Sequence, residues 1–234
     1  KHKSEYRARR AAAYDTPFGI AGYPPPSKSA LETTAEERKA KFDQKWAEGG
    51  SISFLYSYTD LLTSKEANDL AIEYVHERIR EIVQDPEAAE LLCPNDHPIG
   101  TKRLVLDTDY YPVYNQPHVS LVNVRKAPIE TLTEKGLRLE DGQEFELDAI
   151  VFATGFDAMT GALKEIDVRT TDGQALTEDW EAGPYTMLGV MCAGFPNMFM
   201  ITGPGSPGVK SQMILSCEQH VDWITDCLAF MRDE

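Results

Sequence analysis

Two short segments of the sequence combine an apolar run with glycine in the manner of ligand-binding turns. Residues 150–155 pass from an apolar run into Thr154-Gly155, and residues 199–208 pass into a Gly- and Pro-rich turn with a helical pattern behind it. In open α/β sheets, ligands bind beyond the carboxyl ends of strands, where glycine lets a backbone approach them closely. Both turns are candidate cofactor contacts, and each taken alone also fits an ordinary strand-ending turn.

The adjacent cations Lys102 and Arg103 form a third candidate, which taken alone fits a solvated surface better than a site. The five histidines do not cluster, and we interpret His97 as structural rather than as an acid or a base. The four cysteines lie far apart, without a CxxC pair or the spacing of a zinc site. The sequence therefore predicts no metal site.

Helical signals lie between residues 34 and 92. Capping boxes predict helix starts at Thr34 and Thr63, with ends at Gly49-Gly50 and near Asp85-Pro86, and a short helix is expected over 88–92. The Pro- and Gly-containing first thirty residues predict no regular structure.

Beyond residue 102 the pattern becomes extended. Alternating runs on either side of Asp141-Gly142, the favoured pair of a tight hairpin, predict a small antiparallel meander. The expected strands of this region are 119–124, 129–133, 136–139 and 144–147. Ala149 to Ala153 and Phe199 to Thr202 are apolar without alternation, which predicts strands buried on both faces, and a last helix begins near Ser211.

Composition limits the class of protein. The 234 residues include 38 acidic and 23 basic side chains, a formal charge of −15 that argues against nucleic-acid binding. No apolar run approaches the roughly 18 to 20 residues of a membrane span, and no signal peptide is visible. We expect a cytoplasmic protein of α/β class, α+β within this chain, that binds neither nucleic acid nor membrane.

Four strings closely resemble, in their order and spacing, the flavin-dependent Baeyer–Villiger monooxygenases of the cyclohexanone and phenylacetone type. The strings are Thr101-Lys102-Arg103-Leu104, Asp107-Thr108-Asp109-Tyr110-Tyr111, the ten residues from Phe152 to Gly161, and Gly203-Pro204-Gly205-Ser206-Pro207. The resemblance implies an enzyme that holds FAD and NADPH, activates O₂ and inserts one oxygen atom beside the carbonyl of a ketone.

The resemblance also implies roles for single residues. Arg103 falls on the family's active-site arginine, a fixed cation suited to the negative charge of the reaction, and Lys102 on the lysine that holds the 2′-phosphate of NADPH. Further cofactor contacts fall on Thr154, Gly155, Asp157, Gly203, Gly205, Ser206 and Met213. Substrate contacts fall on Gly208, Val209 and Lys210, of which Lys210 departs from apolar relatives.

The family's glycine-rich FAD turn, its second such turn for NADPH and its fingerprint between them do not occur in this sequence. The chain therefore resembles the middle and later part of a longer enzyme, without that enzyme's N-terminal FAD-binding part. We expect residues 1–100 to form an irregular segment and a helical insertion, 101–156 the returning half of the NADP-binding domain, and 157–234 part of the FAD-binding domain. We expect the chain alone to be inactive and to self-associate through uncovered strand edges.

Two alternatives stay open. An N-hydroxylating or sulfoxidising flavin monooxygenase is a related class, although the long helical segment and the Lys102-Arg103 pair favour the Baeyer–Villiger type. A non-catalytic module that binds a partner through its helical face is a different class. A yellow protein indicates flavin, whereas a colourless oligomer favours the module.

Overall fold

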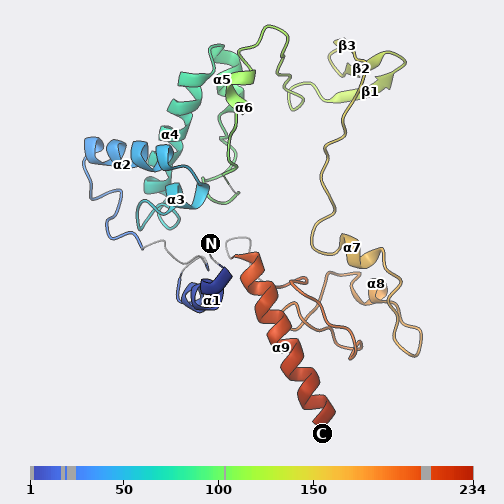
Figure 1. Cartoon of the computed structure of the whole chain (residues 1–234). Helices are drawn as coiled ribbons and strands as arrows, with labels where there is room; N and C mark the ends of the chain where they lie inside the picture. Colours follow the sequence, from blue (N-terminus) through green and yellow to red (C-terminus); the bar gives the residue numbers. More distant parts are fainter. Residues whose placement is uncertain (1–2, 17–18, 20–24, 103, 207–211, 234) are drawn as a thin grey trace. The chain divides into compact units, whose positions relative to one another are not determined.

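The computed structural model describes residues 3–16, 19, 25–102, 104–206 and 212–233 (Figure 1). The chain divides into two compact units, one of residues 24–151 and the other of residues 1–23 and 152–234. The described elements are helices and a small antiparallel sheet, which confirms the predicted mixed α/β class. None of the described helices is long and apolar enough to cross a membrane.

Five of the described α-helices lie in the unit of residues 24–151. They are α2 (Ala35–Glu48), α3 (Ser51–Leu55), α4 (Lys65–Ile82), α5 (Pro86–Leu92) and α6 (Tyr110–Val113). Their core contains an aromatic cluster in which the ring of Phe42 lies 5.2 Å, centroid to centroid, from both Phe54 and Tyr74. Phe42 is 2% exposed, so the apolar side of α2 is buried against α3 and α4.

The helix starts follow local capping. At α2 the predicted box is confirmed: the Glu37 amide donates to Thr34 Oγ1 at 3.2 Å, and the Thr34 amide donates to the Glu37 carboxylate at 3.3 Å. For α4 the predicted cap at Thr63 is wrong by one residue, because Ser64 Oγ accepts the Ala67 amide at 3.2 Å. The short helix α5 is confirmed.

The predicted meander is confirmed as a three-stranded antiparallel sheet in the order β1-β2-β3. Its strands are β1 (Ile129–Thr133), β2 (Gly136–Leu139) and β3 (Glu144–Glu146). The turn between β2 and β3 contains Gly142 at φ 87°, a left-handed conformation that glycine adopts without strain. The strand expected over 119–124 is wrong, because that stretch is irregular.

The two strands predicted as buried on both faces are also wrong. Residues 149–153 form no strand, and Val151 and Phe152 are 86% and 71% exposed. In residues 199–202 the structure shows a single antiparallel bridge, Met191 to Phe199, although Met200 is buried. A strand needs a neighbour for its backbone hydrogen bonds, and no other described segment pairs with residues 149–153.

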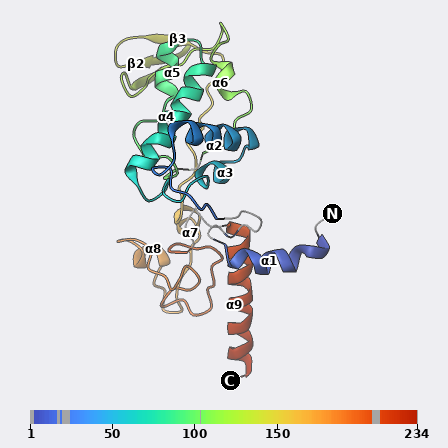
Figure 2. The same cartoon turned by 90° about the vertical axis from the view of Figure 1, so that its left-hand side faces the viewer.

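The unit of residues 1–23 and 152–234 contains α1 (Tyr6–Tyr14), α7 (Gly161–Lys164), α8 (Leu176–Asp179) and α9 (Met213–Asp233), with a 3₁₀ turn, η1 (Lys3–Glu5), before α1. Helix α9 confirms the predicted last helix. The expectation of no regular structure in the first thirty residues is wrong because of α1. Figure 2 shows α1 lying across the N-terminal part of α9.

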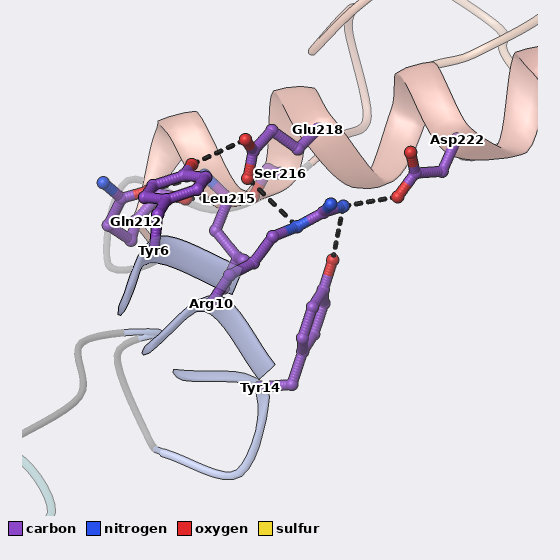
Figure 3. Close-up of polar contacts among 8 residues, drawn as sticks. All are labelled: Tyr6, Arg10, Tyr14, Gln212, Leu215, Ser216, Glu218 and Asp222. Atoms are coloured by element: carbon purple, nitrogen blue, oxygen red, sulfur yellow. Dashed lines mark hydrogen bonds and ion pairs between the residues drawn. The ribbon is translucent and has the colours of Figure 1, made fainter. Parts of the chain in front are cut away.

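Polar contacts with α9 stabilise α1 (Figure 3). The Tyr6 hydroxyl donates to Glu218 Oε1 at 2.5 Å, and Arg10 Nε lies 3.0 Å from Glu218 Oε2. Arg10 also forms an ion pair with Asp222, and this hydrogen bond raises the pKa of Arg10 above its usual value. The first helix thus depends on carboxylates more than 200 residues later in the chain.

A buried amide fixes the backbone that leads to Lys102. Asn68 of α4 is 5% exposed and donates to the carbonyls of Leu61 and Ile99, at 2.7 and 2.9 Å. Its Oδ1 accepts the Ile99 amide at 3.0 Å. Next along the chain, Gly100 has φ 90°, and a β carbon there would lie 2.5 Å from a Leu62 methyl group. The Asn68 amide therefore joins three segments by satisfying buried backbone groups.

We predict that Asn68→Leu destabilises the chain by about 2–4 kcal/mol, because it leaves buried backbone groups without partners. Urea unfolding followed by circular dichroism measures the loss. Glu77→Leu, at an exposed position of the same helix, is the matched control and should change stability by less than about 0.5 kcal/mol. Equal stabilities for the two variants would show that Asn68 does not join these segments.

Candidate functional site

The turn at Gly203–Ser206 is closed by backbone hydrogen bonds. The Ser206 amide donates to the Gly203 carbonyl at 3.0 Å, and the Gly203 amide donates to the Gly189 carbonyl at 3.1 Å. Gly205 lies in the turn with φ 80° and is exposed. A β carbon on Gly205 would lie 3.1 Å from Thr186 Oγ1, so glycine at this position also avoids crowding Thr186.

The backbone of this turn packs closely against Gly189. A β carbon on Gly189 would lie 2.2 Å from Ser206 Cβ and 2.6 Å from the Gly203 carbonyl oxygen. A β carbon on Gly203 would in turn lie 2.7 Å from the Gly189 carbonyl oxygen. Both glycines are required by this approach, and Gly189 also has φ 68°.

Thr186 joins the same two segments. Its hydroxyl donates to the Pro204 carbonyl at 2.6 Å, and its oxygen accepts the Gly189 amide at 3.1 Å. Sequence reasoning missed both Thr186 and Gly189. No short-range pattern marks them, because they lie more than ten residues before the turn that they hold.

Helix α9 begins at Met213, seven residues after Ser206 of the turn. Gln212 Oε1 accepts the Leu215 amide at 2.6 Å and so caps the helix, and Met213 is 40% exposed. Gly19 packs against this first turn, since a β carbon there would lie 3.1 Å from a Leu215 methyl group. The predicted substrate contacts Gly208, Val209 and Lys210 lie outside the described residues.

The predicted contacts Thr154, Gly155 and Asp157 belong to the same unit and are exposed. Gly155 has φ 80°, with no atom within 4 Å of the place of a β carbon. A β carbon on Gly161 would lie 2.7 Å from Asp157 Cβ, so Asp157 lies over the start of α7. The close contact with Asp157 therefore explains why residue 161, the last of the Phe152–Gly161 motif, is a glycine.

Lys102 lies in the other unit, and Arg103 lies outside the described residues. The Lys102 side chain is exposed, and within the described part of the chain no side chain forms an ion pair or hydrogen bond with its ammonium group. Lys102 borders a cavity of about 400 Å³, whose lining includes Trp46, His97 and Tyr111.

The carboxylate of Asp96 lies near this cavity in an electropositive setting. His97 Nδ1 lies 2.5 Å from Asp96 Oδ1, and Arg125 Nη2 lies 3.0 Å from Asp96 Oδ2. The His97 hydrogen bond, then the one from Arg125, lowers the pKa of Asp96 to about 2, and the charge of Lys102 contributes. His97 thus has a local structural partner, as the sequence suggested.

Comparison with known proteins gives homologues over most of the chain, although no family model matches it. It is 39% identical over 214 residues to a phenazine N-monooxygenase of Lysobacter antibioticus and, at the same identity and length, to a Baeyer–Villiger monooxygenase of Pseudooceanicola batsensis; each alignment covers 91% of this chain. It is 38% identical over 202 residues, 86% of the chain, to a cyclohexanone 1,2-monooxygenase of Acinetobacter. These matches cover 39%, 38% and 36% of the three relatives, so the chain spans about two fifths of their length.

Solved structures agree. The structure of OTEMO in complex with FAD and NADP has a TM-score of 0.89 at 34% identity, covering 99% of this chain and 43% of that one. A steroid monooxygenase bound to NADP has a TM-score of 0.86 at 44% identity, covering 99% and 44%. The chain is thus homologous to one part of the flavoprotein monooxygenases. Within that class, it corresponds to a part of the Baeyer–Villiger type, as its motifs indicated.

We predict that Gly189→Ala costs about 1–3 kcal/mol more than Gly194→Ala, because only the first β carbon would overlap the turn. Gly194 is the matched control: it has φ 82°, and the nearest atom to its β carbon would be 3.9 Å away. Both substitutions carry the penalty of a positive φ, so their difference isolates the overlap. Chemical unfolding measures it, and equal losses would contradict the close approach.

Proposed function

We propose that this chain is part of an FAD- and NADPH-dependent monooxygenase that inserts one oxygen atom of O₂ next to a ketone carbonyl, forming an ester or lactone. The observation that carries the proposal is homology to a Baeyer–Villiger monooxygenase over 91% of the chain, which spans both the Lys102 segment and the glycine turn. The relatives' names and the FAD and NADP in their solved structures supply the chemistry and the cofactors.

The glycine turn fits a flavin contact. Gly205 is exposed, so a planar ring can approach the backbone of the turn at this residue. In the proposal, Gly203, Gly205, Ser206 and Met213 contact FAD, and the positive end of α9 stabilises negative charge on the reduced cofactor. The bound flavin supplies the reduction of O₂; the chain supplies the fixed backbone.

The remaining assignments are also proposals. Thr154, Gly155 and Asp157 contact the cofactors at a link between domains, where Gly155 permits the turn. Residues 1–100 form an N-terminal segment and helical insertion, 101–156 part of an NADP-binding domain, and 157–234 part of an FAD-binding domain.

For substrate, we propose that Arg103 stabilises the negative charge of oxygen insertion and that Gly208, Val209 and Lys210 contact the ketone. A cytoplasmic location and an inactive isolated chain remain our expectations. Self-association is supported by exposed apolar side chains of the segment predicted as a strand, such as Val151 and Phe152.

N-oxidation is the second candidate function, because the phenazine N-monooxygenase is as similar to this chain as the Baeyer–Villiger relative. In the first reaction, oxygen is inserted between the carbonyl carbon and a neighbouring carbon, and in the second it is added to a ring nitrogen. The complete enzyme can be offered cyclohexanone and phenazine in parallel, with products identified by mass spectrometry. Ester from the ketone supports the first function, and N-oxide without ester supports the second. If neither product forms and the protein holds no flavin, the result would favour the non-catalytic module that binds a partner.

We predict that Lys102→Ala in the complete enzyme weakens the binding of NADPH by about 1.5–3 kcal/mol, the range for hydrogen bonds to charged groups, and leaves the binding of NADH nearly unchanged. The reason is that only NADPH carries the 2′-phosphate. Steady-state KM values with each cofactor measure the effect. Lys126→Ala removes an equal charge from an exposed site and serves as control. Equal losses for both cofactors would assign Lys102 a structural role.

For Arg103→Ala, we predict that NADPH consumption persists while ester formation falls about 100-fold or more, as after loss of an oxyanion-hole donor. The cation would act on oxygen insertion rather than on flavin reduction. Product yield per NADPH is the measurement, with Arg232→Ala, at an exposed position near the end of α9, as the matched arginine control. A normal ester yield from Arg103→Ala would refute the assignment.

A further inference from the structure

His220 of α9 contacts both ends of the glycine turn. The Thr202 amide donates to His220 Nδ1 at 3.0 Å, and His220 Nε2 lies 3.2 Å from Ser206 Oγ. The ring therefore connects the residue before Gly203 with the residue that closes the turn. No other histidine in the described chain has this arrangement, and neither motif spacing nor clustering marked His220 in the sequence.

These contacts determine the proton position on the ring. A backbone N–H can only donate, so Nδ1 must accept from Thr202 with its lone pair. A neutral ring then carries its hydrogen on Nε2, which donates to Ser206 Oγ. A proton on Nδ1 would place two N–H groups against each other and break the contact with Thr202.

Thr202 is in a conformation that requires such an anchor. Its φ is 52°, in the left-handed region that β-branched residues rarely adopt. Backbone of this kind persists only where surrounding contacts hold it, and it concentrates at ligand-binding sites. The hydrogen bond from the Thr202 amide to His220 is such a contact, and it lies directly before the exposed backbone of the turn.

We propose that His220 is a positioning residue: in its neutral Nε2–H form it anchors the Thr202–Ser206 segment and so presents the turn's backbone to the flavin. The flavin half of this inference rests on the proposed function, whereas the anchoring half concerns this chain alone. His220 does not touch reacting atoms. It acts through the turn, together with the close packing of Gly189 and Gly203 on the side of the turn toward residues 186–190.

The anchoring is tested on the 234-residue chain by NMR. We expect ¹⁵N spectra to show the Nε2–H tautomer, and His220→Ala to speed hydrogen exchange of the Thr202 amide about tenfold. His220→Asn should keep most of the protection, because its Oδ1 can accept as Nδ1 does, whereas His220→Gln should keep less. Circular dichroism confirms that each variant is folded. An Nδ1–H tautomer, or unchanged exchange in His220→Ala, overturns the anchoring.

The flavin half is tested by titrating the apo form of the complete enzyme with FAD. His220→Ala should weaken FAD binding about tenfold, and His220→Asn should recover part of the lost affinity. Adding Thr202→Gly to His220→Ala should also restore affinity, because glycine adopts the positive φ without an anchor. Unchanged FAD affinity in His220→Ala, or no recovery by either route, overturns the positioning role. If the parent enzyme binds no flavin, the proposed function fails with this half, and the exchange data still decide the anchoring.

Discussion

Close backbone contact between Gly189 and the Gly203–Ser206 turn is the constraint on which the candidate flavin site depends. The distances leave no room for a β carbon on either side, so the two segments meet through backbone atoms. Backbone packed in this way cannot adjust by changing rotamers, and hydrogen bonds add to the close contact in fixing its position. Thr186 supplies these from the side of residues 186–190, and His220 supplies them from α9. The result is an exposed turn with a fixed conformation, as the proposed flavin contact needs.

The segment before Lys102 follows the same principle in the other unit. Asn68 satisfies three backbone groups at once, and Gly100 takes a positive φ under the Leu62 side chain. A long, flexible lysine side chain thus starts from a rigid backbone. Fixing the base of the side chain would reduce the entropy lost in the anion binding that we propose for Lys102.

The exposed apolar segments have a physical explanation in the length of the relatives. Residues 150–152 read as a buried strand, yet Val151 is 86% exposed. Burial of a strand requires neighbours on its edges and layers on its faces. The chain matches about two fifths of its relatives, whose solved structures hold FAD and NADP in more than twice the length of chain. Apolar surface of this kind is what further segments of such a fold would cover.

The sequence by itself determined the features that depend on a few consecutive residues. The capping box of Thr34, the hairpin at Asp141-Gly142 and the short helix α5 were predictable because their stabilising contacts are local. The family motifs could also be recognised from the sequence, because each is a run of consecutive residues. Tertiary structure decided the rest. Helix α1 is stabilised by ion pairs of Arg10 with carboxylates more than 200 residues later in the chain. Residues 149–153 form no strand because no other described segment pairs with them. His220 received its partners from residues 14 and 18 positions away. Such contacts carry no signal in local spacing, because the chain brings them together only by folding.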